Sequence, residues 1–117
     1  MRTTLRSETR SIAIAASPAR VHAFMADADN LPTWAPGFAA QAVPGSFAIL
    51  ADAECGTVDI VAATDHSRGA FARVLPNAGG SEVLFTLLFP PEAPESAVDE
   101  QMATVDEELA AVRDACQ

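Results

Sequence analysis

The sequence lacks lysine and tyrosine altogether, and among its 117 residues it has only two histidines, two cysteines and one tryptophan. Arginine supplies all seven basic residues against sixteen acidic ones, and the net charge of −9 argues against a sequence-independent grip on nucleic acid. Cys55 and Cys116 lie far apart and form no CxxC pair, so neither a disulfide framework nor a structural zinc site is expected. Nucleotide-binding and metal-ligand motifs are also missing, and we expect no metal ion and no cofactor.

Long apolar runs are missing as well. The longest apolar stretch, residues 34–53, is interrupted by two prolines and two glycines and falls short of the ~20 continuous apolar residues that a membrane span needs. The apolar patch Ile12–Ala16 is shorter than the roughly 7 to 15 residues of a signal-peptide core. The sequence therefore predicts a cytoplasmic protein with no integral membrane association.

The chain length predicts one domain, since residues 1–117 leave room for a single core at roughly 100 to 200 residues per domain. An alternating pattern over Thr3–Ala15 predicts a strand, and Ser17-Pro18 supplies the cap and first residue of a helix. A second short helix is predicted at Leu31–Ala35. Turn residues then divide the chain into an antiparallel meander with predicted strands at Phe38–Val43, Ser46–Leu50, Thr57–Thr64, Ala70–Leu75 and Ser81–Phe89.

A long amphipathic helix is predicted to begin at Ser96. Its apolar residues recur at steps of three and four, which places them on one face of an α-helix. Residues 92–117 contain eight acidic side chains and one basic side chain, and we interpret this acidity as the solvated face of the same helix. The apolar stripe consists of Val98, Met102, Val105, Leu109, Val112 and Cys116.

Two hairpin registers determine which side chains share a face of the predicted sheet. With Thr64 opposite Ala70, and Pro76 opposite Ser81, one face is wholly apolar and must pack against the helix stripe. Ala62 and Ala72 then lie opposite each other on this face, and because native cores leave few voids we favour close packing of the helix there over a hollow. The apolar face consists of Val58, Ile60, Ala62, Ala72, Val74, Val83, Phe85 and Leu87.

The other face of the predicted sheet combines charge with apolar side chains. Asp59, Arg73 and Glu82 lie within diagonal reach of one another, and we interpret them as a solvated cross-strand salt-bridge patch. The apolar residues around them exceed what a solvated face needs, which favours a homodimer surface as one interpretation. These residues are Val61, Phe71, Leu75, Leu84 and Leu88.

The order of strand, two short helices, antiparallel meander and long C-terminal helix resembles the α+β helix-grip fold of the START-like superfamily, also called SRPBCC or polyketide cyclase/dehydrase-like. The segment SIAIAASPARVHAFMADADNLPTWAPGF is similar to that family's opening, and GTVDI and RVLPNAGGSEVLFTLLF are similar to its later strands. The resemblance implies a curved sheet around the long helix, with a cavity for an apolar or amphipathic small molecule. The expected lining is Trp34, Phe38, Ile60, Ala62, Ala72, Val74, Val83, Phe85, Met102, Val105 and Leu109.

Two features depart from that family's pattern. Some relatives have Asp-His where this chain has Asp59-Ile60, so an apolar residue replaces a polar group of the pocket. The segment between Gly45 and Gly56 is also about one strand shorter than usual.

Side chains that ordinarily titrate near neutral pH are scarce in this sequence, which has two histidines. His66 is expected in a solvated turn, and His22 is expected at the surface of the first helix rather than at a cavity mouth, so no catalytic residue is assigned. We therefore expect binding of a small hydrophobic ligand without its transformation. Two alternatives stay open: a polyketide cyclase- or dehydratase-type enzyme, and a homodimeric interaction module without a ligand.

Overall fold

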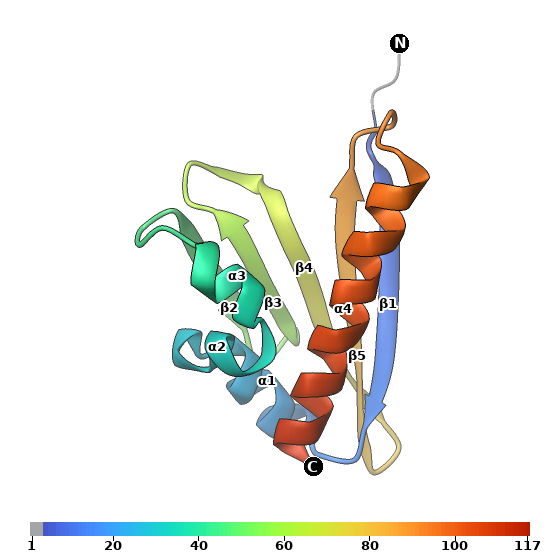
Figure 1. Cartoon of the computed structure of the whole chain (residues 1–117). Helices are drawn as coiled ribbons and strands as arrows, with labels where there is room; N and C mark the ends of the chain where they lie inside the picture. Colours follow the sequence, from blue (N-terminus) through green and yellow to red (C-terminus); the bar gives the residue numbers. More distant parts are fainter. Residues whose placement is uncertain (1–3) are drawn as a thin grey trace.

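A five-stranded antiparallel sheet forms the centre of the molecule (Figure 1). The computed structural model describes residues 4–117, so Thr3, where the opening strand was predicted to begin, lies outside the described residues. Strand order across the sheet is β1-β5-β4-β3-β2. The strands are β1 (Arg6–Ile14), β2 (Phe47–Asp52), β3 (Thr57–Ala62), β4 (Asp65–Asn77) and β5 (Gly80–Phe89).

Helices lie between β1 and β2 and after β5, which confirms the predicted α+β architecture with a long C-terminal helix. At the first helix, the Ser17 side chain accepts a hydrogen bond from the Arg20 amide at 3.2 Å, and Pro18 occupies the first turn, as predicted. In the part of the chain that the structure describes, no helix is long and apolar enough to cross a membrane. The helices are α1 (Pro18–Ala26), the 3₁₀ turn η1 (Ala28–Asn30), α2 (Leu31–Trp34), α3 (Pro36–Gln41) and α4 (Glu95–Cys116).

The predicted strand Phe38–Val43 is wrong, because helix α3 covers most of it. Proline is well placed in a first helical turn, and Pro36 begins α3 rather than ending the helical region. Phe38 consequently packs edge-on against Phe47 of β2, with 5.1 Å between the ring centroids. The segment therefore covers the sheet instead of extending it.

The hairpin registers agree with the prediction in one case and differ in the other. Pro76 pairs with Ser81 as predicted. In the β3–β4 hairpin, however, Ala70 pairs with Ile60 rather than with Thr64, so Ala72 lies opposite Val58 and the predicted Ala62–Ala72 pair does not form. Because the shift is an even number of residues, the apolar side chains keep the predicted face.

A bulge in β4 explains the shifted register. Val61 pairs with Gly69 while the next residue, Ala62, pairs with Asp65, so residues 66–68 have no place in the ladder. A Cβ atom at position 69 would collide with the carbonyl oxygen of Ile60. Glycine is therefore required where the two backbones approach most closely.

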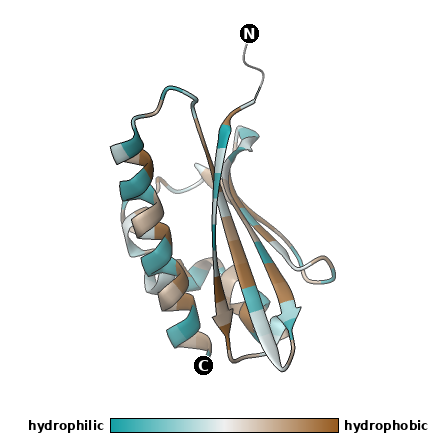
Figure 2. Cartoon of the chain, turned by 90° about the vertical axis from the view of Figure 1, so that its right-hand side faces the viewer, coloured by the Kyte–Doolittle hydropathy of each residue, from teal (hydrophilic) through white to brown (hydrophobic). Residues whose placement is uncertain are grey.

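Helix α4 packs mainly on β1, at one edge of the sheet, and the side view in Figure 2 shows it standing on one face of the strands. All six residues of the predicted apolar stripe are buried, which confirms the stripe as part of the core. Two hydrogen bonds hold the C-terminal end of the helix: Arg20 Nε donates to the Cys116 carbonyl at 2.7 Å, and the Ala15 amide donates to Gln117 Oε1 at 2.9 Å.

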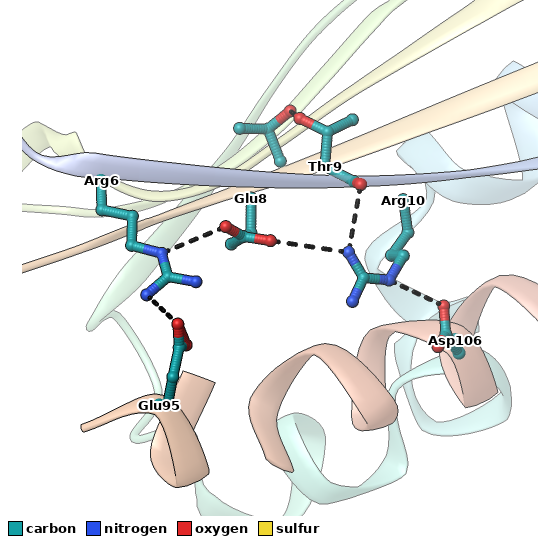
Figure 3. A network of polar contacts seen from close by, with 7 residues as sticks. Arg6, Glu8, Thr9, Arg10, Glu95 and Asp106 are labelled. Atoms are coloured by element: carbon teal, nitrogen blue, oxygen red, sulfur yellow. Dashed lines mark hydrogen bonds and ion pairs between the residues drawn. The ribbon is translucent and has the colours of Figure 1, made fainter. Parts of the chain in front are cut away.

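A chain of ion pairs joins β1 to the N-terminal end and the middle of α4 (Figure 3). Arg6 Nη1 lies 3.0 Å from Glu95 Oε1, and Arg10 Nε lies 3.6 Å from Asp106 Oδ1. Glu8 connects the two arginines, at 3.1 Å from Arg6 Nε and 3.7 Å from Arg10 Nη1. These side chains are partly solvated, so they orient the helix more than they stabilise it.

The predicted salt-bridge patch on the outer face is not formed. Within residues 4–117, none of Asp59, Arg73 and Glu82 makes an ion pair, and Glu82 instead accepts a hydrogen bond from the Asn77 side chain at 3.0 Å. Burial raises the pKa of Asp59 despite its hydrogen bond with the Ala72 backbone. The alternation of side chains along the strands therefore predicted the face on which these three charges lie, but not the groups that they contact.

Substitution of Met102 by Asp tests the docking of α4. Met102 is fully buried, so an uncompensated charge there is expected to cost about 4 kcal/mol or more, a large part of a typical stability of about 5 to 15 kcal/mol. We expect loss of cooperative thermal unfolding by circular dichroism, while Ala103→Asp at the neighbouring exposed position melts nearly as the parent does. A soluble Met102→Asp protein with an unchanged melting temperature would contradict the docking.

Candidate functional site

A pocket of about 230 Å³ lies between α4, the α2–α3 segment and the inner face of the sheet. Trp34 and Phe85 are buried at its inner end, whereas Phe38 and Gln101 are exposed and flank its mouth. The wall is largely apolar, with three aromatic rings. Its lining consists of Trp34, Ala35, Phe38, Ile60, Gly69, Ala70, Phe85, Leu87, Gln101 and Glu108.

The pocket lies where aromatic side chains face small residues of the sheet, at the junction between α4 and the α2–α3 segment. Trp34 of α2 packs edge-on against Phe85 of β5, with 6.2 Å between the ring centroids. Beside this contact, β4 contributes only Gly69 and Ala70, which fill little of the space under α4. Because the bulge requires glycine at position 69, no side chain fills this part of the space between α4 and the α2–α3 segment.

The structure divides the eleven predicted lining residues into three groups. Four of them, Trp34, Phe38, Ile60 and Phe85, come together around the pocket. Ala62 instead lies in a neighbouring groove of about 660 Å³, which shares Phe38, Ile60 and Gly69 with the pocket. The remaining six are buried in the closed core and do not contribute to the described pocket wall: Ala72, Val74, Val83, Met102, Val105 and Leu109.

Glu108 and Gln101 are the pocket residues that sequence reasoning missed. Both were assigned to the solvated side of the long helix, yet both line the pocket. The spacing did contain a signal, because steps of three and four also connect residues 98, 101, 105, 108 and 112. Two polar residues at such positions mark the border of the apolar stripe, where the helix faces a space rather than a side chain.

Glu108 has an unusual electrostatic environment. Burial against the apolar wall raises the pKa of its carboxyl to about 7, and the neighbouring carboxylate of Glu107 adds to the effect. Within residues 4–117, Glu108 makes no ion pair and is the only titratable side chain that lines the pocket. The pocket therefore has one carboxyl that changes its charge near neutral pH.

Trp34, which lines the pocket, also carries a buried polar atom without a hydrogen-bond partner in the described chain. The residue is 1% exposed, and its Nε1 hydrogen has no acceptor among the residues that the structure describes. A buried N–H without a partner costs about 1 to 3 kcal/mol.

The two histidines lie away from the pocket. His22 is buried, which corrects the predicted surface position, and its Nε2 lies 3.0 Å from the Thr57 carbonyl oxygen at the opposite end of β3. His66 is exposed in the β4 bulge. Among the described residues, no group of three or more His, Cys, Asp or Glu side chains is arranged to hold a metal ion.

The Glu108 carboxyl is expected to destabilise the folded protein at alkaline pH. The pKa is about 7 in the folded state, against an ordinary value of 4.5, so the cost is absent below pH 4.5, grows up to pH 7 and is complete above it. Urea unfolding of Glu108→Gln should show a gain of about 1 to 2 kcal/mol at pH 8, after allowance for solvent screening, and almost none at pH 4.5. Glu100→Gln, at an exposed position on α4, is the control, and an equal gain in both variants would contradict the assignment.

The comparisons with known proteins identify the fold. The sequence matches no protein-family model and no curated protein. Among solved structures, XoxI from Bacillus cereus has a TM-score of 0.68 at 17% identity, and the Aha1 dimer from Colwellia psychrerythraea has 0.69 at 16%, each with 96% of both chains covered. Ara h 8.0201 has a TM-score of 0.65 at 15% identity, over 96% of this chain and 97% of that one. Identities this low establish a shared fold alone, and the chain has the predicted helix-grip fold.

Proposed function

We propose that this chain is a START-like protein that binds a small apolar or amphipathic molecule in the pocket beside α4. The observation that carries the proposal is the pocket itself, which is walled by aromatic and aliphatic side chains and has polar groups at only a few points. This combination is typical of small-molecule sites, where apolar walls provide affinity and a few polar groups orient the ligand.

The volume limits the size of the ligand. Drug-sized ligands occupy pockets of roughly 300 to 1,000 Å³, whereas a cavity of about 150 Å³ accepts benzene. At about 230 Å³, the pocket suits a body of one or two fused rings. A longer ligand would extend past Phe38 into the neighbouring groove, with which the pocket shares part of its wall.

Binding without chemical transformation is favoured by the position of the acid–base groups. Neither histidine lines the pocket, and Ile60 presents an apolar side chain to it. The cyclase- or dehydratase-type alternative rests on Glu108, because a carboxyl with a pKa of about 7 suits proton transfer at neutral pH. A single carboxyl without a second positioned acid or base makes this the weaker candidate.

A homodimer through the outer face of the sheet is a further candidate, and Leu88 is the observation that favours it. This side chain is 40% exposed on the outer face of β5. The apolar area around it is smaller than predicted, because Val61 is buried and the other outer residues are half-buried. One protein with the same fold, Aha1 from Colwellia psychrerythraea, is described as a dimer.

Paired substitutions on β4 test the ligand pocket. Ala70 lines the pocket, whereas Ala72, two residues further along the same face, is 5% exposed in the closed core. Ala70→Leu should therefore weaken binding of 1-naphthylmethanol about tenfold or more, with the melting temperature unchanged or raised, because the added methylenes occupy free space. Ala72→Leu should instead overpack the core and cost about 1 to 3 kcal/mol.

The measurements are a fluorescence titration with 1-naphthylmethanol and a thermal melt of each variant. Either of two results would contradict the pocket proposal: no binding of the probe by the parent protein, or equal destabilisation by Ala70→Leu and Ala72→Leu.

A further inference from the structure

We infer that the ligand is an organic cation, with an ammonium group at Glu108 and an apolar ring body against Trp34 and Phe85. This inference deepens the proposed function and rests on it, because it assigns a chemical class to the occupant of the same pocket. Neither the fold nor the apolar wall requires a charged ligand. The charge follows from the polar groups that the pocket presents.

The polar end of the pocket is acidic. Glu108 supplies a carboxyl that can accept hydrogen bonds from an ammonium group, and Gln101, two turns earlier on the same face of α4, adds an amide oxygen. The carboxylate of Glu107 stands next to Glu108 on the exposed side and adds negative potential. The chain as a whole carries a net charge of −9, which favours the approach of cations over anions.

The arginines near α4 are already occupied and do not neutralise Glu108. Arg6 and Arg10 of β1 pair with Glu8 and with acidic residues of α4, and Arg20 of α1 donates to the Cys116 carbonyl. On α4 itself, Arg113 pairs with Asp114, while Asp99, Glu100 and Glu107 are exposed acids. His22 of α1 lies away from Glu108, with its Nε2 at hydrogen-bond distance from the Thr57 carbonyl oxygen.

From the elements that form the rest of the wall, the pocket receives only uncharged side chains within the described residues. Arg68 of β4, next to Gly69, is exposed and lines the neighbouring groove instead. Three of the uncharged side chains are aromatic: Trp34, Phe38 and Phe85. The faces of aromatic rings attract ammonium groups, with an interaction that grows as the cation is desolvated. A carboxyl and three aromatic rings around one space form a set suited to an apolar amine and poorly suited to a carboxylic acid.

The charge of Glu108 makes this binding dependent on pH. In the free protein the pKa of the carboxyl is raised to about 7, so at pH 5.5 it is mostly neutral and at pH 8 mostly ionised. An ammonium group favours the ionised form, and its binding must therefore release a proton below pH 7. Affinity for a cation should fall as the pH falls, whereas affinity for a neutral molecule of the same shape should change little.

Three matched probes separate charge from shape: 1-naphthylmethylamine, 1-naphthylmethanol and 1-naphthoic acid, each titrated calorimetrically into the full chain. At pH 8 we expect the amine to bind at least tenfold more tightly than the alcohol, and the acid to bind most weakly. At pH 5.5 the amine should lose about tenfold or more of its affinity, while the alcohol changes less than threefold. The preference for the amine should fall below threefold in Glu108→Gln and remain in Glu100→Gln, which removes an exposed charge from the same helix.

The outcomes distinguish the inference from the function on which it rests. Binding of the alcohol as tightly as the amine, or an equal loss of preference in both variants, would overturn the cation assignment and leave the pocket in place. Failure of all three probes to bind the parent protein would overturn the proposed function, and the cation assignment with it.

Discussion

A single helix is too narrow to cover the inner face of this sheet, and the pocket results from that mismatch. A helix with its side chains is ~10 Å across and neighbouring strands are ~4.8 Å apart, so α4 can cover about two of the five strands. Its apolar stripe lies at the β1 edge of the sheet. Hydrogen bonds from Arg20 and Ala15 hold its C-terminal end, and arginines of β1 form ion pairs with Glu95 at its N-terminal end and with Asp106 near its middle. Other elements must therefore cover β3 and β2, and these are the short helices (Figure 1).

The proposed binding site lies at the boundary between α4 and the short helices. Trp34 reaches Phe85 and closes the inner end of this boundary, but the glycine and alanine that β4 presents leave space beside them. Glu108 faces that space at a cost to folding, since its carboxyl is partly desolvated without a basic partner in the described chain. A feature that lowers stability and orients a polar group into a pocket is characteristic of a binding site, where stability and function often conflict.

Sequence reasoning predicted the elements that periodicity controls and missed those that depend on tertiary contacts. The α4 stripe, the apolar face of the sheet and the β4–β5 register followed from local spacing and turn chemistry. The β3–β4 register did not, because the bulge before Gly69 depends on a close approach to the Ile60 backbone that one strand alone does not reveal. Helix α3 was missed for a related reason, since Phe38 in an Ala-rich segment fits a strand or a helix until its contact with Phe47 is known.

The central claim is that the junction beside α4, and no other surface, receives the ligand. Isotope-filtered nuclear Overhauser spectra of the labelled protein with 1-naphthylmethanol test it most directly, because they report which methyl groups lie within contact distance of the aromatic protons. The account predicts contacts to Ile60 and Leu87 of the pocket wall and none to Val105 of the closed core. Contacts to Leu75 and Leu84 on the outer face of the sheet, in place of the pocket methyl groups, would contradict it.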